Sequence, residues 1–357
     1  MRQTIVDPPC RHQPQGMRMP RPEDIRIYYL PAALARTIGV LTFLIVASTC
    51  SAQLPGVESR LSLQERIEAR LDSLPAASSL YAIHLVTGQK VGVRADVPMS
   101  TMSVIKIPIM VLAFRDAEAG RLNLEERYTL RVEDLRGGTG VLQTFAPGLR
   151  PTYRDLVGQM MITSDNSATD IMIARLGLDR VNHMLDSLGY RETRLRTTIG
   201  EWFRGIWKTV DPKYASLTDR EVFDRTPLLR TVRPQIFAYN QDSTKWFGRS
   251  TAREIAKLLD QLEREKLASP PSTKDMREIL QRQLYYSRLP QRIRFRVVVG
   301  HKTGDSPPAI GNDVGILYSR SGPIVIAVFT NGNLGNYADL DATIARVAED
   351  ILDAWDR

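Results

Sequence analysis

Apolar residues recur along the chain with two different periods, and each period has its own region. Alternation of apolar and polar positions, which is typical of strands, is found near both ends, at 80–86, 90–93, 295–302, 314–318 and 323–330. Helical spacing fills the middle of the chain and both flanks, at 62–74, 103–118, 152–163, 166–175, 178–188, 250–264, 273–284 and 340–355. The pattern therefore predicts two groups of strands separated by a block of helices.

Strands from the two ends of a chain bury their apolar faces most simply in one shared sheet. The predicted fold class is therefore α+β with two lobes: an antiparallel sheet built from both termini with flanking helices, and an inserted all-helical lobe. We assign residues 60–102 and 285–357 to the sheet lobe and residues 103–284 to the helical lobe of a single domain, residues 60–357. A cleft between the lobes is the expected place for a functional site.

The first 52 residues have a different character. Residues 37–52 contain an apolar run of about ten residues between a basic residue and a group of small residues, which is typical of a secretory signal peptide. The run is shorter than the roughly 20 apolar residues of a membrane-spanning helix. We predict cleavage after Ala52, export to the periplasm or the medium, and no stable membrane span in the mature chain. A buried N-terminal helix and a lipid anchor at Cys50 are the alternatives, and Met17 or Met19 is an alternative start.

Composition narrows the chemistry of the remaining chain. Both cysteines, Cys10 and Cys50, lie in the segment predicted to be removed, so thiol nucleophiles, disulfides and thiolate metal sites are not expected in the mature protein. The formal net charge is +8, of which residues 1–52 contribute +3 and the rest +5. This modest excess, without a basic run interleaved with aromatics, does not indicate nucleic-acid binding. The four histidines form no ligand pattern, and we expect no metal and no other cofactor.

Three short motifs carry candidate chemistry. Ser103 and Lys106 stand three residues apart at the start of a predicted helix, so they share a face, and a desolvated lysine can accept the serine proton. Ser164-Asp165-Asn166 lies between two predicted helices, and Lys302-Thr303-Gly304 ends a predicted strand. Each motif alone has a plain structural explanation, as a helix N-cap or a strand-terminal turn. The three motifs together, in this order, form a far more specific pattern than any one of them alone.

This ordered set occurs in class A β-lactamases and penicillin-binding proteins. From residue 60 to residue 357 the chain resembles the class A β-lactamase-like serine hydrolases of the penicillin-recognising superfamily. The likeness includes the flanking stretches VPMSTMSVIKIPIM, ITSDNSATDIMI and HKTGDSPPAIGNDVGIL, the helix STAREIAKLLDQL and the strand IVIAVFTNG.

The resemblance implies a catalytic role for four residues. Ser103 is expected to form an acyl-enzyme, and Lys106 to take or relay its proton. Ser164, aided by Lys302, is expected to pass a proton to the leaving nitrogen.

The resemblance also implies a set of substrate-binding residues. Asn166 is expected to hydrogen-bond the substrate's amide side chain, and Thr303, with Lys302, to hold its carboxylate. Gly304 is also expected to belong to this set, and the N–H group of Asp305 to join that of Ser103 as an oxyanion donor.

The chain departs from the family pattern in the part that serves deacylation. Class A β-lactamases carry an R-x-E-x-x-L-N segment whose glutamate activates a water, and the corresponding stretch here, LRTTIGEWFRG, has Ile199 at that position. Glu201 stands two positions later and is a candidate base only if the loop bends differently; a solvated loop acid is the alternative. An insertion at about 203–249 follows, which we expect to border the cleft. Gly311 replaces a carboxylate-binding arginine of many relatives.

Three functions are compatible with these residues. The leading hypothesis is β-lactamase-type hydrolysis of a β-lactam amide through an acyl-enzyme. The first alternative is a D-Ala-D-Ala peptidase, a penicillin-binding protein or another amide or ester hydrolase with slow deacylation. The second is a non-catalytic envelope binding protein, which the intact motifs argue against. The expected partner is a small molecule, either a β-lactam or a peptidoglycan peptide, bound by a monomer.

Overall fold

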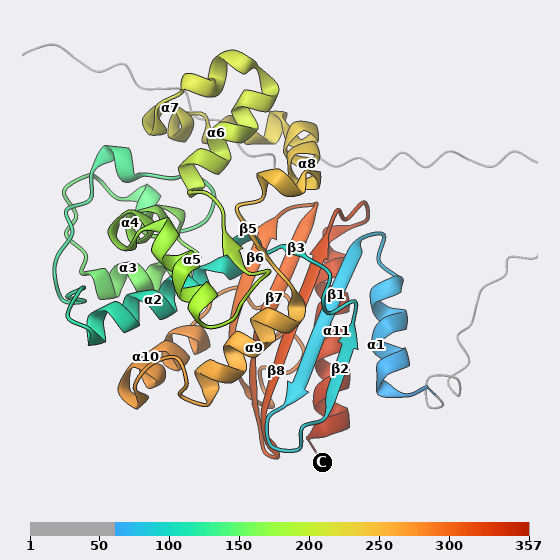
Figure 1. Cartoon of the computed structure of the whole chain (residues 1–357). Coiled ribbons are helices and arrows are strands. Elements are labelled where there is room, and N and C mark those ends of the chain that lie inside the picture. Colours follow the sequence, from blue (N-terminus) through green and yellow to red (C-terminus); the bar gives the residue numbers. More distant parts are fainter. Residues whose placement is uncertain (1–60, 357) are drawn as a thin grey trace, which may run out of the picture. The chain divides into compact units, whose positions relative to one another are not determined.

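The computed structural model describes residues 61–356 of the chain (Figure 1). These residues fall within one compact unit, residues 54–357. The predicted signal peptide, its cleavage site and both cysteines lie outside the described residues. Within 61–356, every helix is too short or too polar to cross a bilayer.

A five-stranded antiparallel sheet joins the two ends of the described chain, in the order β2-β1-β8-β7-β6. Its strands are β1 (Ala77–His84), β2 (Lys90–Val93), β6 (Val298–Ser306), β7 (Ile310–Ser319) and β8 (Gly322–Asn331). The first strand pairs with the last, with Ala77 opposite Asn331 and Ala82 opposite Ile326. The predicted fold class is confirmed.

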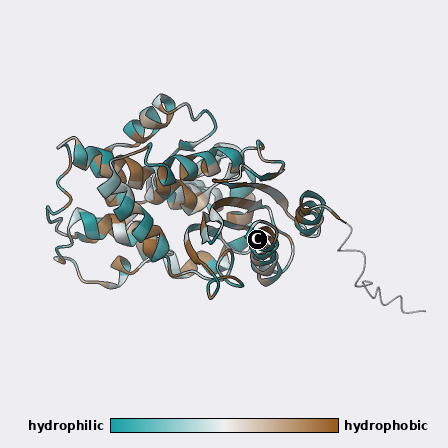
Figure 2. Cartoon of the chain, turned by 90° about the horizontal axis from the view of Figure 1, so that it is seen from below, coloured by the Kyte–Doolittle hydropathy of each residue, from teal (hydrophilic) through white to brown (hydrophobic). Residues whose placement is uncertain are grey.

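The two faces of this sheet are covered by different helices, as period-two alternation requires. On β8, Ile324, Ile326 and Val328 pack with helices α1 (Leu63–Asp72) and α11 (Tyr337–Trp355), which contact each other. The intervening residues of β8 pack into the larger core of the helical lobe, where α9 (Ala252–Glu263) lies on the sheet. The helices carry stripes of hydrophobic and hydrophilic residues accordingly (Figure 2).

The helical lobe is built around one buried helix. This helix, α2 (Lys106–Glu118), is buried continuously from Lys106 to Phe114 and contacts four others. They are α3 (Tyr153–Ile162), α4 (Asn166–Leu176), α5 (Leu178–Ser187) and α10 (Pro270–Gln281). The 3₁₀ helix η3 (Met102–Ile105) runs directly into α2. Short 3₁₀ turns η4 (Val132–Asp134) and η5 (Leu142–Thr144) interrupt the connection between α2 and α3.

Several predicted element boundaries are wrong by three or more residues, and two of them have a clear local reason. The strand expected from residue 295 begins only at Val298, because the chain turns through Phe295, whose side chain is 90% exposed. Helix α10 begins three residues earlier than expected, since Pro270 and Pro271 occupy its first turn, where a proline's missing N–H is not needed.

The region of the expected insertion is helical. It contains α6 (Ile199–Val210), η6 (Pro212–Ser216), α7 (Asp219–Asp224), η7 (Thr226–Thr231), α8 (Arg233–Gln241) and η8 (Ser243–Lys245). We call residues 199–247 the α6–α8 segment; it is drawn in yellow-green to gold in Figure 1. A small sheet of β3 (Met99–Ser100), β4 (Arg194–Leu195) and β5 (Gly248–Ser250) lies at its base. The limits of the lobes and of the insertion stay a prediction.

Buried charges attach the α6–α8 segment to the helical lobe. The Asp170 carboxylate on α4 accepts hydrogen bonds from the first N–H groups of α6, those of Ile199 at 2.7 Å and Gly200 at 2.9 Å. Arg136 pairs with Asp170 at 2.6 Å and with Asp219 of α7 at 2.7 Å. The start of α6 is therefore fixed by an anion at its positive end.

Candidate active site

A close approach of strand β6 to the η3 turn brings the first and third motifs together. A Cβ atom at Gly304 would lie 2.3 Å from the carbonyl oxygen of Thr101 and 3.2 Å from the backbone nitrogen of Ser103. A Cβ atom does not fit 2.3 Å from a backbone oxygen, so only glycine allows this contact. Ser103 is half-buried at the head of α2 and lines the cavity between the lobes.

Two lysine side chains from different lobes converge on one hydroxyl group, that of Ser164. Lys106 Nζ, on α2, lies 3.2 Å from Ser164 Oγ, and Lys302 Nζ, on β6, lies 3.0 Å from it. Lys106 also donates to the Ser164 carbonyl oxygen at 2.7 Å. All three motifs therefore meet in one place.

The backbone at this site adopts conformations that non-glycine residues rarely take. Met102, directly before Ser103, has φ 43°, and Ser164 has φ 54°. Such residues cost about 1–3 kcal/mol each and persist where the surroundings fix them. Ser164 has this conformation where its side chain contacts both lysines.

Burial changes the proton affinity of both lysines. Burial, together with the charge of Lys302, lowers the pKa of Lys106 well below its usual value. Burial lowers the pKa of Lys302 to about 7, while the nearby Asp305 carboxylate acts in the opposite direction. An ammonium loses its hydration on burial, and two of them repel each other. The site therefore favours one neutral lysine near pH 7.

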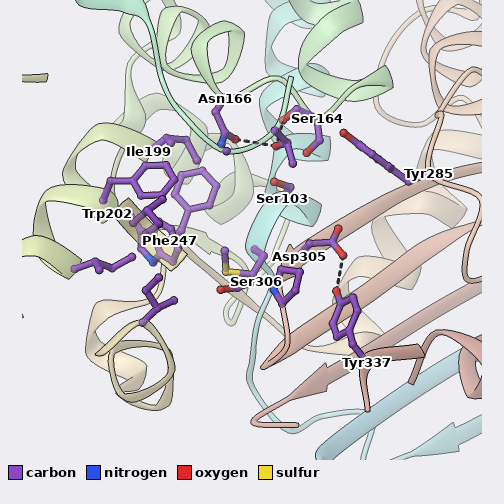
Figure 3. Close-up of a pocket in the computed structure, with 18 of the residues that line it drawn as sticks. Ser103, Ser164, Asn166, Ile199, Trp202, Phe247, Tyr285, Asp305, Ser306 and Tyr337 are labelled. Atoms are coloured by element: carbon purple, nitrogen blue, oxygen red, sulfur yellow. Dashed lines mark hydrogen bonds between the residues drawn. The ribbon is translucent and has the colours of Figure 1, made fainter. Parts of the chain in front are cut away.

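The other sequence-predicted residues surround this centre. Asn166 accepts a hydrogen bond from Lys106 Nζ at 3.1 Å through Oδ1 and donates to the Gly137 carbonyl oxygen at 2.8 Å. The Thr303 hydroxyl is buried and has no hydrogen-bond partner among residues 61–356. Asp305 follows Gly304 on β6 and lines the cavity, and Figure 3 shows Ser103 lying between Ser164 and Asp305 in that view.

The cavity beside Ser103 has a volume of about 430 Å³, within the range of small-molecule sites. One side of it belongs to the α6–α8 segment and is apolar (Figure 3). That side comprises Ile199, Trp202, Phe203, Ile206, Leu229, Ile236 and Phe247. The segment therefore borders the cavity with apolar side chains.

Glu201 does not line this cavity. Its carboxylate turns back to the start of α6, where it accepts from Thr197 Oγ1 at 2.8 Å and from the Thr198 N–H at 3.1 Å. The Thr198 N–H and the Thr197 and Thr198 hydroxyls lower the pKa of Glu201. The residue that does line the cavity is Ile199, which is 5% exposed. The sequence carried a signal for this arrangement, because Thr198 and Glu201 form the T-x-x-E pattern of a capping box.

Sequence reasoning missed a buried arginine at the opposite side of the cavity. Arg288 donates to Asp341 at 2.7 Å and to the Tyr337 hydroxyl at 2.8 Å, and it also pairs with Asp305. Tyr337 donates to Asp305 as well, at 2.7 Å (Figure 3). Burial acts to raise the pKa of Asp305, but Arg288 outweighs it and holds that pKa below its usual value. The Asp305 carboxyl group is therefore ionised.

Gly311 has a packing reason for being glycine. A Cβ atom there would lie 2.6 Å from Leu340 and 3.0 Å from the Tyr337 hydroxyl, so an arginine side chain does not fit. Arg288 is the guanidinium that borders the cavity instead. His301, one of the four histidines of the sequence, is buried, and its Nδ1 lies 2.9 Å from Asp313 Oδ1. Residues 61–356 hold no cluster of histidine, cysteine and acidic side chains suited to a metal ion.

Comparison with known proteins places this geometry in a family context. A model of the beta-lactamase enzyme family matches residues 62–355. The chain is similar in structure to a beta-lactamase from Sphaerobacter thermophilus DSM 20745, with 25% identity, a TM-score of 0.66, and coverage of 82% of this chain and 96% of that one. No curated protein matches the chain.

Two further solved structures share the fold at lower identity. A beta-lactamase from Chitinophaga pinensis DSM 2588 is 18% identical, with a TM-score of 0.66 and coverage of 82% of this chain and 98% of that one. A variant of PBP-A, described as an acyl-enzyme complex with penicillin G, is 22% identical, with a TM-score of 0.65 and coverage of 82% and 95%.

The close approach at Gly304 leads to a first prediction. Gly304→Ala should slow the labelling of Ser103 by a fluorophosphonate about a hundredfold, because the added Cβ forces β6 away from η3 and a shift of about 1 Å costs that much. Gly158→Ala on α3 is the control, since its Cβ would meet no atom within 4 Å. Labelling rates are read by intact-protein mass spectrometry, with circular dichroism as the folding check. Wild-type labelling in folded Gly304→Ala protein would contradict the argument.

Proposed function

Because the chain belongs to the beta-lactamase enzyme family, we propose that it is a serine hydrolase that opens β-lactams and related amides or esters by acylation of Ser103 and releases the acyl group slowly. One observation carries the proposal. Two buried lysines converge on Ser164 beside Ser103, while the facing wall presents Ile199 and no carboxylate.

In the proposed acylation step, the Ser103 oxygen attacks the carbonyl carbon and its proton passes to Lys106. A serine hydroxyl needs such a base, and the lowered pKa of Lys106 makes its neutral amine available near neutral pH. The negative charge that develops on the carbonyl oxygen is stabilised by the backbone N–H groups of Ser103 and Asp305.

The leaving nitrogen requires a proton when its bond to the carbonyl carbon breaks. Ser164 is suited to deliver it, because both lysine nitrogens lie within hydrogen-bonding distance of its hydroxyl oxygen. As Ser164 gives up its proton, the ammonium of Lys106 or Lys302 replaces it. Ser103 then carries the acyl group as an ester; the amine of an open-chain amide departs, whereas the nitrogen of an opened β-lactam stays attached to the acyl group.

Release of the acyl group is the slow step in this proposal. Hydrolysis of the ester needs a water and a base to accept its proton, and such a base contributes roughly 10²- to 10⁴-fold to the rate. The position expected to hold that base is Ile199, Glu201 caps α6, and Asp170 is occupied by Arg136 and the α6 N–H groups. The alternative of slow deacylation is therefore favoured over rapid β-lactam turnover.

The acyl-enzyme can be observed directly. With penicillin G, we expect a mass adduct on Ser103 that persists for many minutes, and no adduct in the Ser103→Ala variant. The PBP-A variant described as a penicillin G acyl-enzyme shares this fold and supports the choice of reagent. Intact-protein mass spectrometry over time, with peptide mapping, makes the measurement. If β-lactams and activated esters leave no adduct, or if esterase activity survives in Ser103→Ala, the proposed function is wrong.

The missing base can be supplied by mutation. Ile199→Glu should shorten the lifetime of the Ser103 adduct at least about tenfold, because it puts a carboxylate on the cavity wall. Glu201→Gln is the matched control and should leave the lifetime unchanged, since that side chain lies at the α6 N-terminus. Both lifetimes come from the decay of the adduct by mass spectrometry, with melting temperatures recorded alongside. If the wild-type protein turns over penicillin G and Glu201→Gln abolishes that turnover, Glu201 is the base and this assignment is wrong.

The two lysines should give acylation a distinctive pH profile. The rate should rise with pH on the acid side, because Lys106 must lose its proton to act as the base. With penicillin G it should fall again above about pH 7, by up to about tenfold per pH unit, as Lys302 loses the charge that binds the substrate carboxylate. An uncharged p-nitrophenyl ester should lack this alkaline fall. Stopped-flow acylation rates from pH 5 to 9 test both limbs, and identical profiles for the two substrates would exclude this role for Lys302.

A further inference from the structure

The cavity beside Ser103 has two chemically different sides. Toward Asp305 it is lined by Arg288 and Asp341, which form a buried ionic network. Toward the α6–α8 segment the lining residues are apolar, with Trp202 and Phe247 beside Ile199 (Figure 3). A substrate lying across Ser103 therefore meets an apolar surface at one end and charged groups at the other.

The apolar side is rigidly built. Trp202 packs edge-on against Phe203, with ring centroids 5.0 Å apart, and against Tyr239 of α8 at 6.3 Å. Gly205 allows α6 and α8 to touch, since a Cβ there would lie 2.0 Å from the Tyr239 hydroxyl. At the far end of α8, Asn240 donates to Ser306 on β6 at 2.8 Å. The segment is thus fixed at both ends around the cavity.

Part of this surface is left uncovered by the protein itself. Leu229 of η7 and Ile236 of α8 are only half-buried, and both line the cavity. The neighbouring Leu228 points elsewhere: its side chain is 50% exposed and does not line the cavity. Apolar surface held open next to a reactive serine gains free energy when an apolar group covers it.

We propose that the α6–α8 segment is an acyl-binding wall that selects amides or esters whose acyl part is a bulky, uncharged apolar group. The inference rests on the proposed acylation of Ser103. A charged acyl part would lose its hydration against Trp202, Leu229 and Ile236 without gaining an oppositely charged partner, because the charges that line the cavity lie at the Arg288 end.

A series of p-nitrophenyl esters tests the proposal. The acylation rate constant divided by KM should increase from the acetate ester through the butyrate ester to the octanoate ester. Each buried methylene strengthens binding roughly fourfold. We expect octanoate to exceed butyrate at least tenfold. Release of p-nitrophenol in stopped-flow measurements gives each value. Equal values for the three esters would overturn the acyl-binding wall while leaving Ser103 acylation intact, whereas no acylation by any ester would overturn the proposed function itself.

A matched pair of variants locates the effect on the α6–α8 segment. Leu229→Asn should lower the octanoate-to-acetate ratio at least tenfold, and Leu228→Asn, one residue away in the same 3₁₀ helix, should keep the wild-type ratio. The ratio is independent of the fraction of folded protein. Ile236→Asn on α8 provides a second test if Leu229→Asn does not fold. If both cavity variants keep the wild-type ratio, the apolar wall serves only the packing of the segment and the proposal is wrong.

Discussion

The arrangement of this protein depends on holding the amino groups of two buried lysines against one hydroxyl group. Lys106 comes from the helical lobe and Lys302 from the sheet, and both are completely buried. Each charge destabilises the other, so the contact exists only because the two lobes are packed around it. The close approach at Gly304 and the left-handed turn at Ser164 are the local means by which the backbone achieves this.

Sequence periodicity predicted the elements that have one buried face, because such faces leave a regular pattern. It placed α2, α3, α4, α5 and the strands β7 and β8 near their observed positions. The sequence pattern did not predict the helices of the α6–α8 segment, because its 3₁₀ turns interrupt the helical spacing of the apolar residues. Arg288 was not predicted to lie at the cavity, because its partners Asp305 and Asp341 are distant in sequence and no local pattern links them to it.

The motif residues were predictable in identity but not in their contacts. The order of three motifs indicated that Ser103, Ser164 and Lys302 belong together, whereas the sharing of Ser164 Oγ by two lysines needed coordinates. Glu201 shows the opposite case. Its capping-box spacing was visible in the sequence, and local hydrogen bonding to a helix start takes precedence over reaching into a cavity.

In the proposed mechanism, binding of an anionic substrate and acylation depend on the protonation of the same residue, Lys302. Arg288 faces two carboxylates, those of Asp305 and Asp341, so its positive charge is already compensated within the protein. The charge left for an anionic substrate is that of Lys302, whose pKa of about 7 makes it conditional on pH. A bound carboxylate would itself raise that pKa, because it favours the ammonium form. In that mechanism, an anionic substrate would therefore keep Lys302 protonated, and Lys302 could return a proton to Ser164 as the leaving nitrogen takes one.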